Sequence, residues 1–455
     1  MSNQREALVE WAVPAQPCQG EERGWQRQAE SSELADGVGT SPTSHRQAAL
    51  AAATRHKAST QYSLRVTLTR LAQVTLRPRP SHLVPISLLC LCLSCRVEQA
   101  RDPRWARIDA AVQEEIQAGH LPGAVVLVGQ GNRVLYHKAF GRAVAEPFQE
   151  PMRRDTVFDM ASLTKPIATA AAVLVLLDQG RLDPNDLVGK YLPAFACNGK
   201  ENVRLRHLLT HTSGLPAYTD ANDLKTRYGS PCPDKVIEKI CSLKAQSEPG
   251  EKFRYSCLGY ITLAQIVRTV TDQGIDEFSQ ANVFARLGMK HTCFHPPAAW
   301  LKKIAGTEIV DNVLLRGTVH DPLARLMAGT SGNAGLFSTA SDLSVYCRML
   351  LNGGSWKGQR ILSPAAVQML TTTQSHGRAY GFDVSSSYAW IKGPYASPAA
   401  FCHSGYTGTS LVCDPATGTY LILLTNSVHP HDKGMSKPLR QKTAEIVFGP
   451  RGDHD

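Results

Sequence analysis

Residues 158–169 have the sequence FDMASLTKPIAT. Ser162 and Lys165 are three positions apart, at the start of an apolar run that continues to Leu177. Residues with this spacing share one face of a helix, so the run predicts a helix that begins at the serine. Pro166 is compatible with a first turn, where backbone N–H groups have no helical partner. The stretch therefore brings a hydroxyl and an amine together at the start of an apolar helix.

The pair of Ser162 and Lys165 has a direct chemical use. Burial and the partial positive charge of a helix N-terminus both disfavour the charged form of a lysine. An uncharged Lys165 could take the proton of Ser162 and make the serine a nucleophile. The alternative is a chance Ser-x-x-Lys on a solvated helix face, and the apolar flanks argue against it.

Composition and charge exclude some functions. The chain has 455 residues, of which 43% are hydrophobic, enough for a large core in two or three structural units. The net charge of +10 is spread along the chain without interleaved aromatic and basic residues, so we predict no nucleic-acid binding. The twelve cysteines do not have zinc-finger spacing. His207 and His211 lack the adjacent glutamate of the His-Glu-x-x-His zinc motif, so we predict no metal site.

The sequence of residues 1–100 predicts that the protein is exported. Residues 1–80 lack a sustained apolar period and are predicted to be a disordered extension. Residues 81–100 carry a short apolar stretch that ends at Ser94-Cys95, too short to span a bilayer as a helix. It resembles a secretory signal or a lipoprotein-type segment with a lipidated cysteine, and the alternative is a hydrophobic patch in the extension. We therefore expect an exported protein, periplasmic or in the cell envelope, with a lipid anchor as its membrane attachment and a translation start downstream of Met1.

Residues 104–448 are predicted to form one domain, followed by a tail at 449–455. The fold class expected is α+β or α/β, with an antiparallel sheet built from both chain ends, flanked by helices, and an inserted, mainly helical subdomain. The predicted helices cover 105–116, the run after Ser162, 203–209, 263–270, 341–352, a short one from 363, and 434–447. The predicted strands cover 124–129, 134–137, 400–403, 409–413 and 420–424.

Two further motifs carry candidate chemistry. Tyr255-Ser256-Cys257 leaves a turn just before a helix, and a phenol beside a positive lysine is expected to lose its proton more readily than usual. Such a phenol could pass a proton to a leaving group. His403-Ser404-Gly405 ends a predicted strand, where Gly405 would let substrate approach the backbone closely. The N–H groups of Tyr406 and Ser162 could then form an oxyanion hole.

Taken alone, each motif also fits a buried core tyrosine or a strand-end histidine. In this order, however, the motifs resemble the class C-like branch of the serine β-lactamase and penicillin-binding protein superfamily. That branch includes class C β-lactamases, D-alanyl-D-alanine carboxypeptidases, D-aminopeptidases and family VIII esterases. Its motifs Ser-x-x-Lys, Tyr-x-Asn and Lys/His-x-Gly match Ser162/Lys165, Tyr255 and His403/Gly405.

The resemblance implies a β-lactamase/transpeptidase-like fold and an acyl-enzyme on Ser162. Lys165 and Tyr255 would share the base and acid roles, and no metal or organic cofactor would be needed. One departure is Cys257 in place of the asparagine, because a thiol is a poor hydrogen-bonding group. Because of this departure, we expect ester hydrolysis more than efficient β-lactamase or peptidase activity.

The expected function is therefore a serine hydrolase acting on a small-molecule ester, an amide or a cell-wall peptide, of the esterase, carboxypeptidase or β-lactamase type. The alternative is a non-catalytic penicillin-recognising scaffold that binds peptide-like ligands or a partner. Cys402 and Cys413 flank the predicted turn between two strands, and in an exported protein they could form a disulfide if they face each other.

Overall fold

The computed structural model describes residues 102–432 and 436–450. The extension 1–80, the apolar segment 81–100 and residues 451–455 of the tail lie outside the described residues, so the expectations for them stay predictions. The α-helices are α2 (Arg104–Gln117), α3 (Ala171–Asp178), α4 (Leu205–Leu209), α5 (Ala221–Tyr228), α6 (Pro233–Ser242), α7 (Cys257–Thr271), α8 (Ile275–Ser279), α9 (Ala285–Leu287), α10 (Pro322–Leu326), α11 (Ala340–Leu351), α12 (Pro364–Thr371) and α13 (Lys437–Phe448). The strands are β1 (Gly123–Gln130), β2 (Arg133–Val144), β3 (Glu150–Pro151), β4 (Phe158–Asp159), β5 (Ile309–Val310), β6 (Val313–Leu314), β7 (Phe337–Ser338), β8 (Ser355–Trp356), β9 (Gln359–Arg360), β10 (Phe401–Ser404), β11 (Ser410–Asp414) and β12 (Thr419–Thr425).

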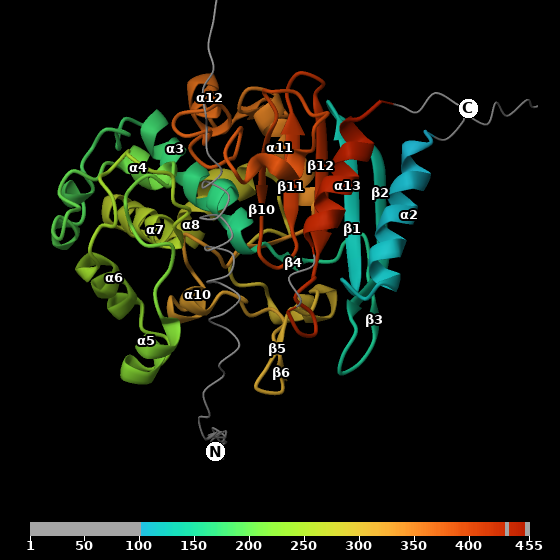
Figure 1. Ribbon diagram of the computed structural model, residues 1–455. Helices are drawn as coiled ribbons and strands as arrows, with labels where there is room; N and C mark the ends of the chain where they lie inside the picture. Colours follow the sequence, from blue (N-terminus) through green and yellow to red (C-terminus); the bar gives the residue numbers. More distant parts are fainter. Residues whose placement is uncertain (1–101, 433–435, 451–455) are drawn as a thin grey trace, which may run out of the picture. The chain divides into compact units, whose positions relative to one another are not determined.

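The main sheet joins the two ends of the domain. Its strand order is β10-β11-β12-β1-β2-β3, and neighbouring strands are antiparallel. β1 and β12 pair from Ala124↔Thr425 to Gln130↔Thr419, although the two strands lie near opposite ends of the described chain (Figure 1). The predicted fold class, an antiparallel sheet from both chain ends with flanking helices, is confirmed.

The central strands β1 and β12 are buried on both faces. Successive side chains of a strand point to opposite faces. Val126 and Val128 belong to the core under α2 and α13, whereas Val125 and Leu127 belong to the larger core on the other side, with Leu343 of α11. A strand that is buried on both faces needs apolar residues at every position, which explains why β1 is a continuous apolar run.

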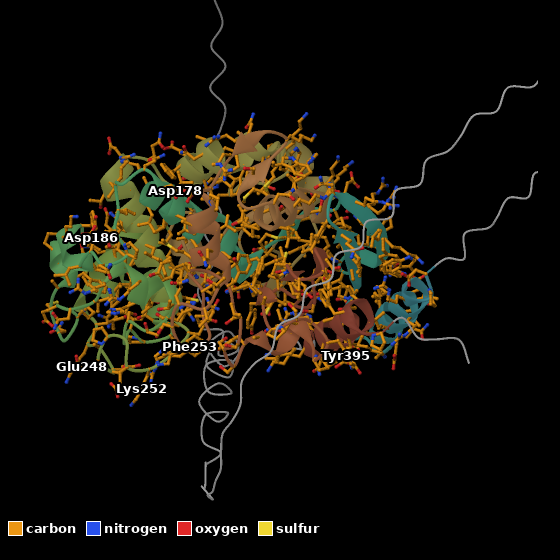
Figure 2. The ribbon with its side chains drawn as sticks, turned by 90° about the horizontal axis from the view of Figure 1, so that it is seen from above. Asp178, Asp186, Glu248, Lys252, Phe253 and Tyr395 are labelled. Atoms are coloured by element: carbon orange, nitrogen blue, oxygen red, sulfur yellow. The ribbon has the colours of Figure 1, made fainter. Side chains whose placement is uncertain are left out.

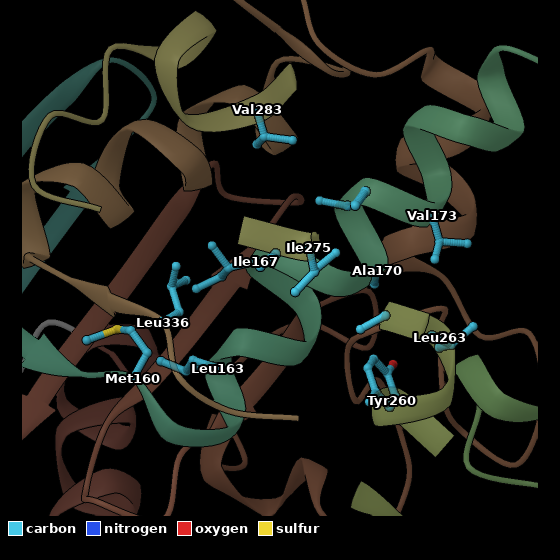
Figure 3. Packing of buried hydrophobic residues seen from close by; sticks show 14 of the residues in the cluster. Met160, Leu163, Ile167, Ala170, Val173, Tyr260, Leu263, Ile275, Val283 and Leu336 are labelled. Carbon is cyan, nitrogen blue, oxygen red and sulfur yellow. The ribbon is translucent and has the colours of Figure 1, made fainter. Parts of the chain in front are cut away.

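The chain between β4 and β7 contains the helices α3 to α10. Of these, α4, α5, α6 and α7 lie to one side of the main sheet (Figure 1). The core of this region includes Ile167 and Ala170 from the segment after Ser162, which lie with Tyr260 and Leu263 of α7 (Figure 3). The segment Ala161–Asp178 has the length and hydropathy of a membrane span, but 83% of it is buried inside the described domain. Most of this segment therefore packs inside the core of the domain.

The segment after Ser162 differs from the regular helix that the sequence predicts. It begins with a 3₁₀ turn at Ala161–Leu163, continues as a π-helix at Lys165–Ala170, and becomes α-helical only in α3. The physical reason lies at Pro166, which has no N–H to give to the carbonyl four residues before it. Wider π-type turns occur frequently at functional sites.

The predicted pairing of Cys402 with Cys413 is wrong. The register places Cys402 opposite Val412 and Cys413 opposite Phe401. Cys402 therefore belongs to the core under α2 and α13, and Cys413 to the core on the other face. Two side chains on opposite faces of a sheet cannot form a disulfide without backbone movement. All eight cysteines of the described residues are free.

Candidate active site

The turn that carries Ser162 is conformationally unusual. Ala161 has a φ of 45°, a left-handed conformation that costs an L-residue roughly 1–2 kcal/mol. Its N–H donates to Oδ1 of Asp159 at 2.9 Å, and Oδ2 of Asp159 accepts from the N–H of His320 at 2.7 Å. Burial raises the pKa of Asp159. The surrounding bonds hold Ala161 in this conformation, as is common where backbone strain positions a functional group.

The loop after β10 holds the same turn from the other side. The hydroxyl of Thr407 donates to the carbonyl of Asp159 at 2.8 Å, and that of Thr409 to the carbonyl of Met160 at 3.1 Å. A Cβ atom on Gly405 would lie only 2.4 Å from the Met160 carbonyl oxygen. Gly405 is thus required for the close packing of this loop on the serine turn, whereas its expected contact with substrate stays a prediction.

Lys165 lies beneath Ser162 and is fully buried. Its Nζ is 2.8 Å from Oγ of Ser162, 3.0 Å from the carbonyl oxygen of Asn333 and 3.5 Å from Sγ of Cys257. The irregular helix therefore still brings the hydroxyl and the amine together, as the spacing of the two residues predicts. The contacts with Asn333 and Cys257 fix the direction of the amine.

Tyr255 faces the same pair from the N-terminus of α7. The loop before it is at the surface, where Glu248 and Lys252 are exposed (Figure 2). The chain then turns inward, and the ring of Tyr255 lies between those of His211 and Tyr388, with centroid distances of 4.3 and 5.1 Å. Nζ of Lys165 is 5.0 Å from the centre of the Tyr255 ring.

The electrostatics of Tyr255 differ from the expectation. Burial raises the pKa of Tyr255 well above its usual value, and the neighbouring Cys257 raises it further. A hydrogen bond with Ser162 and the charge of Arg378 lower this pKa, but by less. The expectation that this phenol loses its proton readily is wrong, because desolvation of the phenolate outweighs the nearby positive charges. At neutral pH Tyr255 is a neutral O–H group.

Cys257 is the first residue of α7 and contributes its thiol to the site. Its Sγ is buried against Lys165, and burial raises the pKa of the Cys257 thiol. The thiol is therefore protonated at neutral pH, and it offers substrate much weaker hydrogen bonding than an amide would.

His403 stands at the end of β10 as an uncharged imidazole. Burial lowers the pKa of His403 well below its usual value, and the charges of Arg378 and Lys165 lower it further. Its Nδ1 is 2.8 Å from the carbonyl oxygen of Ser404, which assigns the ring proton to Nδ1. His403 thus occupies the motif position of a lysine without supplying a charge.

A buried ion pair supports this side of the site. Nη1 of Arg378 is 2.6 Å from Oδ1 of Asp383, and neither residue is more than 2% exposed. Asp383 pairs with Cys402 of β10 through backbone hydrogen bonds of 2.8 and 2.9 Å. The positive charge of Arg378 reaches Tyr255, His211 and His403, whose pKa values it lowers.

One open pocket, with about 600 Å³ of empty volume, collects these groups. Its walls are formed by Ser162, Ala217, Tyr218, Tyr255, Cys257, Asp383, Tyr388, His403, Ser404 and Tyr406. Of the sequence-predicted site residues, the pocket brings together Ser162, Tyr255, Cys257, His403 and Tyr406. Lys165 lies directly behind Ser162, and Gly405 packs behind the serine turn.

The sequence reasoning missed several residues of the site. Asp383 and Tyr388 line the pocket, and Asn333, Arg378 and His211 support it. In the sequence His211 is half of a His-x-x-x-His pair. In the structure its Nδ1 accepts from the N–H of Ser256 at 3.1 Å and orients the start of α7. No signal in the sequence marked the other four.

The two histidines considered for metal binding have separate roles. Nδ1 of His207 accepts from the N–H of Arg204 at 3.1 Å and caps α4, whereas His211 binds Ser256. No group of three or more His, Cys, Asp or Glu side chains that could hold a metal ion occurs among the described residues.

Comparisons with known proteins agree with this geometry. The beta-lactamase family model matches residues 108–445. The chain is 31% identical over 371 residues to an N-acetylmuramyl-L-alanine amidase of Bacillus subtilis (strain 168), covering 74% of this chain and 84% of that protein. It is 30% identical over 391 residues to a putative D-alanyl-D-alanine carboxypeptidase of Escherichia coli (strain K12), covering 75% and 90%.

A solved structure supports the fold. EstCE1, described as a hydrolase with promiscuous acyltransferase activity, superposes with a TM-score of 0.62 at 24% identity, over 77% of this chain and 100% of that one. The family match spans most of the chain and includes the Ser162 turn, the start of α7 and the end of β10. The chain therefore belongs to the beta-lactamase family of the serine β-lactamase and penicillin-binding protein superfamily, and it is a serine hydrolase of that family.

Proposed function

We propose that Ser162 is the nucleophile of an acyl-enzyme mechanism and that Lys165 is its base. The observation that carries this proposal is the 2.8 Å contact between Nζ of Lys165 and Oγ of Ser162 inside an open pocket. The carbonyl of Asn333 and the thiol of Cys257 take two of the N–H groups of the amine. In its uncharged form, Lys165 then directs its lone pair at the Ser162 hydroxyl.

In the acylation step, Oγ of Ser162 bonds to the substrate carbonyl carbon as its proton moves to Nζ of Lys165. The carbonyl oxygen becomes an oxyanion, which the N–H groups of Ser162 and Tyr406 stabilise. Tyr255 gives its proton to the leaving group as the bond to the acyl carbon breaks, and it regains a proton from the ammonium of Lys165. The raised pKa of Tyr255 suits a proton donor, because the phenol is in its O–H form before the reaction.

In the deacylation step, water attacks the acyl carbon and the same groups act in reverse. The Tyr255 hydroxyl accepts the proton of the water as it passes its own proton to Lys165, and the ammonium of Lys165 then gives that proton to Oγ of Ser162 as it leaves. The finer proposal is that the substrate is a small ester, an amide or a cell-wall peptide, of the esterase, carboxypeptidase or β-lactamase type. The names of the relatives support this range.

The test of this proposal compares the wild-type chain with Ser162→Ala on p-nitrophenyl esters, a chromogenic cephalosporin and a fluorescent penicillin. We expect ester turnover to fall about 10³-fold or more in Ser162→Ala. Ser341→Ala, on the exposed surface of α11, is the matched control and keeps wild-type turnover. If the wild type neither turns over a substrate nor takes a serine-dependent label, the chain is a non-catalytic scaffold instead.

We further propose that residues 104–448 form the catalytic domain of an exported, periplasmic or cell-envelope protein with a lipid anchor at Cys95. The support is the basic flank and short apolar stretch before Ser94-Cys95. Mass spectrometry of the N-terminal peptide from the mature protein tests this. A lipidated N-terminal Cys95 is the expected result, and a peptide that begins near Met1 excludes it.

A further inference from the structure

We propose that the pocket selects substrates that are uncharged on both sides of the scissile bond, neutral esters above all, and discriminates against substrates with a free carboxylate there. This inference rests on the proposed acyl-enzyme function, and it adds the charge class of the substrate. The observation behind it is the set of charges that the pocket walls present.

The walls contain one acidic side chain and no cationic one among the described residues. Asp383 supplies the acidic group. His403 is the one basic residue among them, and it is uncharged at neutral pH because burial lowers its pKa. The remaining lining residues are four tyrosines, two serines, one cysteine and one alanine, which are neutral at pH 7.

The basic side chains of Lys165 and Arg378, behind the walls, have other partners. Nζ of Lys165 contacts Ser162, Cys257 and Asn333. Nη1 of Arg378 pairs with Asp383 at 2.6 Å, and Arg378 is fully buried. Neither Lys165 nor Arg378 lines the pocket, so neither presents its charge at the walls.

Arg440 is a third buried basic residue near the loop after β10. Its Nη2 donates to the carbonyl of Gly405 at 2.6 Å and to that of Thr409 at 3.2 Å. It does not line the pocket. Its charge therefore supports the loop between β10 and β11 and is not presented to a ligand.

The polar groups of the walls do not suit a peptide either. The hydroxyl of Tyr406 donates to Asp432 at 2.5 Å, and that of Tyr218 to Asp321 at 3.2 Å. These two tyrosines therefore offer mainly their ring faces to a ligand. The thiol of Cys257 binds an amide poorly.

A carboxylate that enters this pocket loses its water and gains no free counter-charge from the walls, because Arg378 is already paired with Asp383. Desolvated charges without partners are strongly disfavoured. An uncharged ester avoids this cost and gains contact with the tyrosine rings. The charge of the substrate is therefore expected to outweigh moderate differences in its size.

The experiment uses two butyrate esters that differ only in the charge of the leaving group: the ester of 4-hydroxybenzoate and the ester of methyl 4-hydroxybenzoate. Each kcat/KM is divided by the rate constant of hydroxide hydrolysis of the same ester, which removes the difference in intrinsic reactivity. We expect the neutral ester to be favoured about 10- to 100-fold, the range for leaving a charged group unpaired. Equal normalised values, or a preference for the anionic ester, would overturn the inference.

The same comparison separates this inference from the proposed function. If neither ester is hydrolysed in a manner that depends on Ser162, the proposed function fails. If both are hydrolysed through Ser162 with equal normalised kcat/KM, the function stands and only the charge selection fails.

A variant tests the origin of the selection. Asp383→Asn removes the wall carboxylate and leaves the charge of Arg378 without its partner, so we expect the preference for the neutral ester to shrink at least about threefold. Asp155→Asn, an exposed residue paired with Lys303 and absent from the pocket walls, is the matched control and keeps the wild-type ratio. A ratio in folded Asp383→Asn equal to that of wild type would contradict the role of Asp383. If this variant does not fold, the wild-type ratio still decides the inference.

Discussion

Nζ of Lys165 lies 3.5 Å from Sγ of Cys257, at the first residue of α7. The motif Tyr255-Ser256-Cys257 therefore contacts the Ser162/Lys165 motif through the sulfur atom of Cys257. A thiol accepts a hydrogen bond weakly, so the amine keeps its main contacts with Ser162 and the Asn333 carbonyl. This arrangement keeps the contact between Lys165 and Ser162, and it places a thiol where the superfamily motif has an amide.

Replacement of Cys257 by asparagine should change the substrate range. Cys257→Asn supplies an amide next to Lys165, which can hold the amide group of a peptide or a β-lactam. We expect the rate of labelling by a fluorescent penicillin, relative to ester turnover, to rise about tenfold, as one new hydrogen bond in a desolvated site allows. Cys257→Ser is the control, because a hydroxyl does not reproduce the amide. An equal ratio in wild type and Cys257→Asn would show that this position does not limit amide substrates.

Tyr255→Phe removes the hydroxyl that we propose as the proton donor, and it keeps the ring. The ring packs between His211 and Tyr388, so we expect a melting temperature close to that of wild type. If Tyr255 acts in the transition state, as we propose, kcat for esters should fall about 10²- to 10⁴-fold with little change in KM.

The useful control for that variant is Tyr388→Phe, which keeps the stacked ring without its hydroxyl. Steady-state kinetics of both variants on one p-nitrophenyl ester decide the matter. A loss of kcat that is as large in Tyr388→Phe as in Tyr255→Phe would argue against a specific role for the Tyr255 hydroxyl.

Gly405→Ala should disturb the serine turn. A Cβ atom at this position would lie 2.4 Å from the carbonyl oxygen of Met160 and 2.2 Å from Oγ1 of Thr409. We expect a loss of stability of about 1–3 kcal/mol, as overpacking typically causes, together with reduced ester turnover. Thermal unfolding and esterase assays measure both effects.

Gly259→Ala is the matched control for that variant. Its Cβ would meet Leu208 at 3.6 Å, an ordinary contact, and the position lies within α7. The free energy of unfolding should stay the same or rise by about 0.5–1 kcal/mol, since alanine favours a helix more than glycine does. If Gly405→Ala is as stable as Gly259→Ala, the close packing of the β10 loop on the serine turn is not required.

Acid should destabilise the domain through its buried histidines. Burial lowers the pKa of His207 to about 4, and it lowers the pKa values of His211 and His403 well below their usual value. The unfolded chain takes up protons on these groups near pH 6.5, whereas the folded chain does so only at lower pH. Stability is therefore greatest above about pH 6.5 and falls as the pH drops from there toward the folded pKa values.

The measurement is the melting temperature between pH 7.5 and pH 5. His207→Gln replaces the most exposed of the three groups, keeps an acceptor for the Arg204 N–H and removes one titrating group. Its melting temperature should depend less steeply on pH than that of wild type. His376→Gln, at an exposed position, serves as the control, and equal slopes in all three proteins would contradict the assignment.

Much of this protein was determined by local sequence. Local sequence patterns predict several elements directly, because each pattern depends only on neighbours in the chain. Examples are the apolar runs of β1 and β12, the Gly131-Asn132 turn, and the Ser363 cap of α12. The spacing of Ser162 and Lys165 likewise brings their side chains together even in an irregular helix, since both lie within one turn.

Other features were decided by tertiary structure. Whether Cys402 and Cys413 share a face depends on strand register, which no local pattern specifies. The high pKa of Tyr255 and the neutral charge of His403 depend on burial by segments far apart in the chain. Asp383 and Arg378 enter the site only because β10 brings their loop to it, so the balance of charge in the pocket is a property of the folded chain.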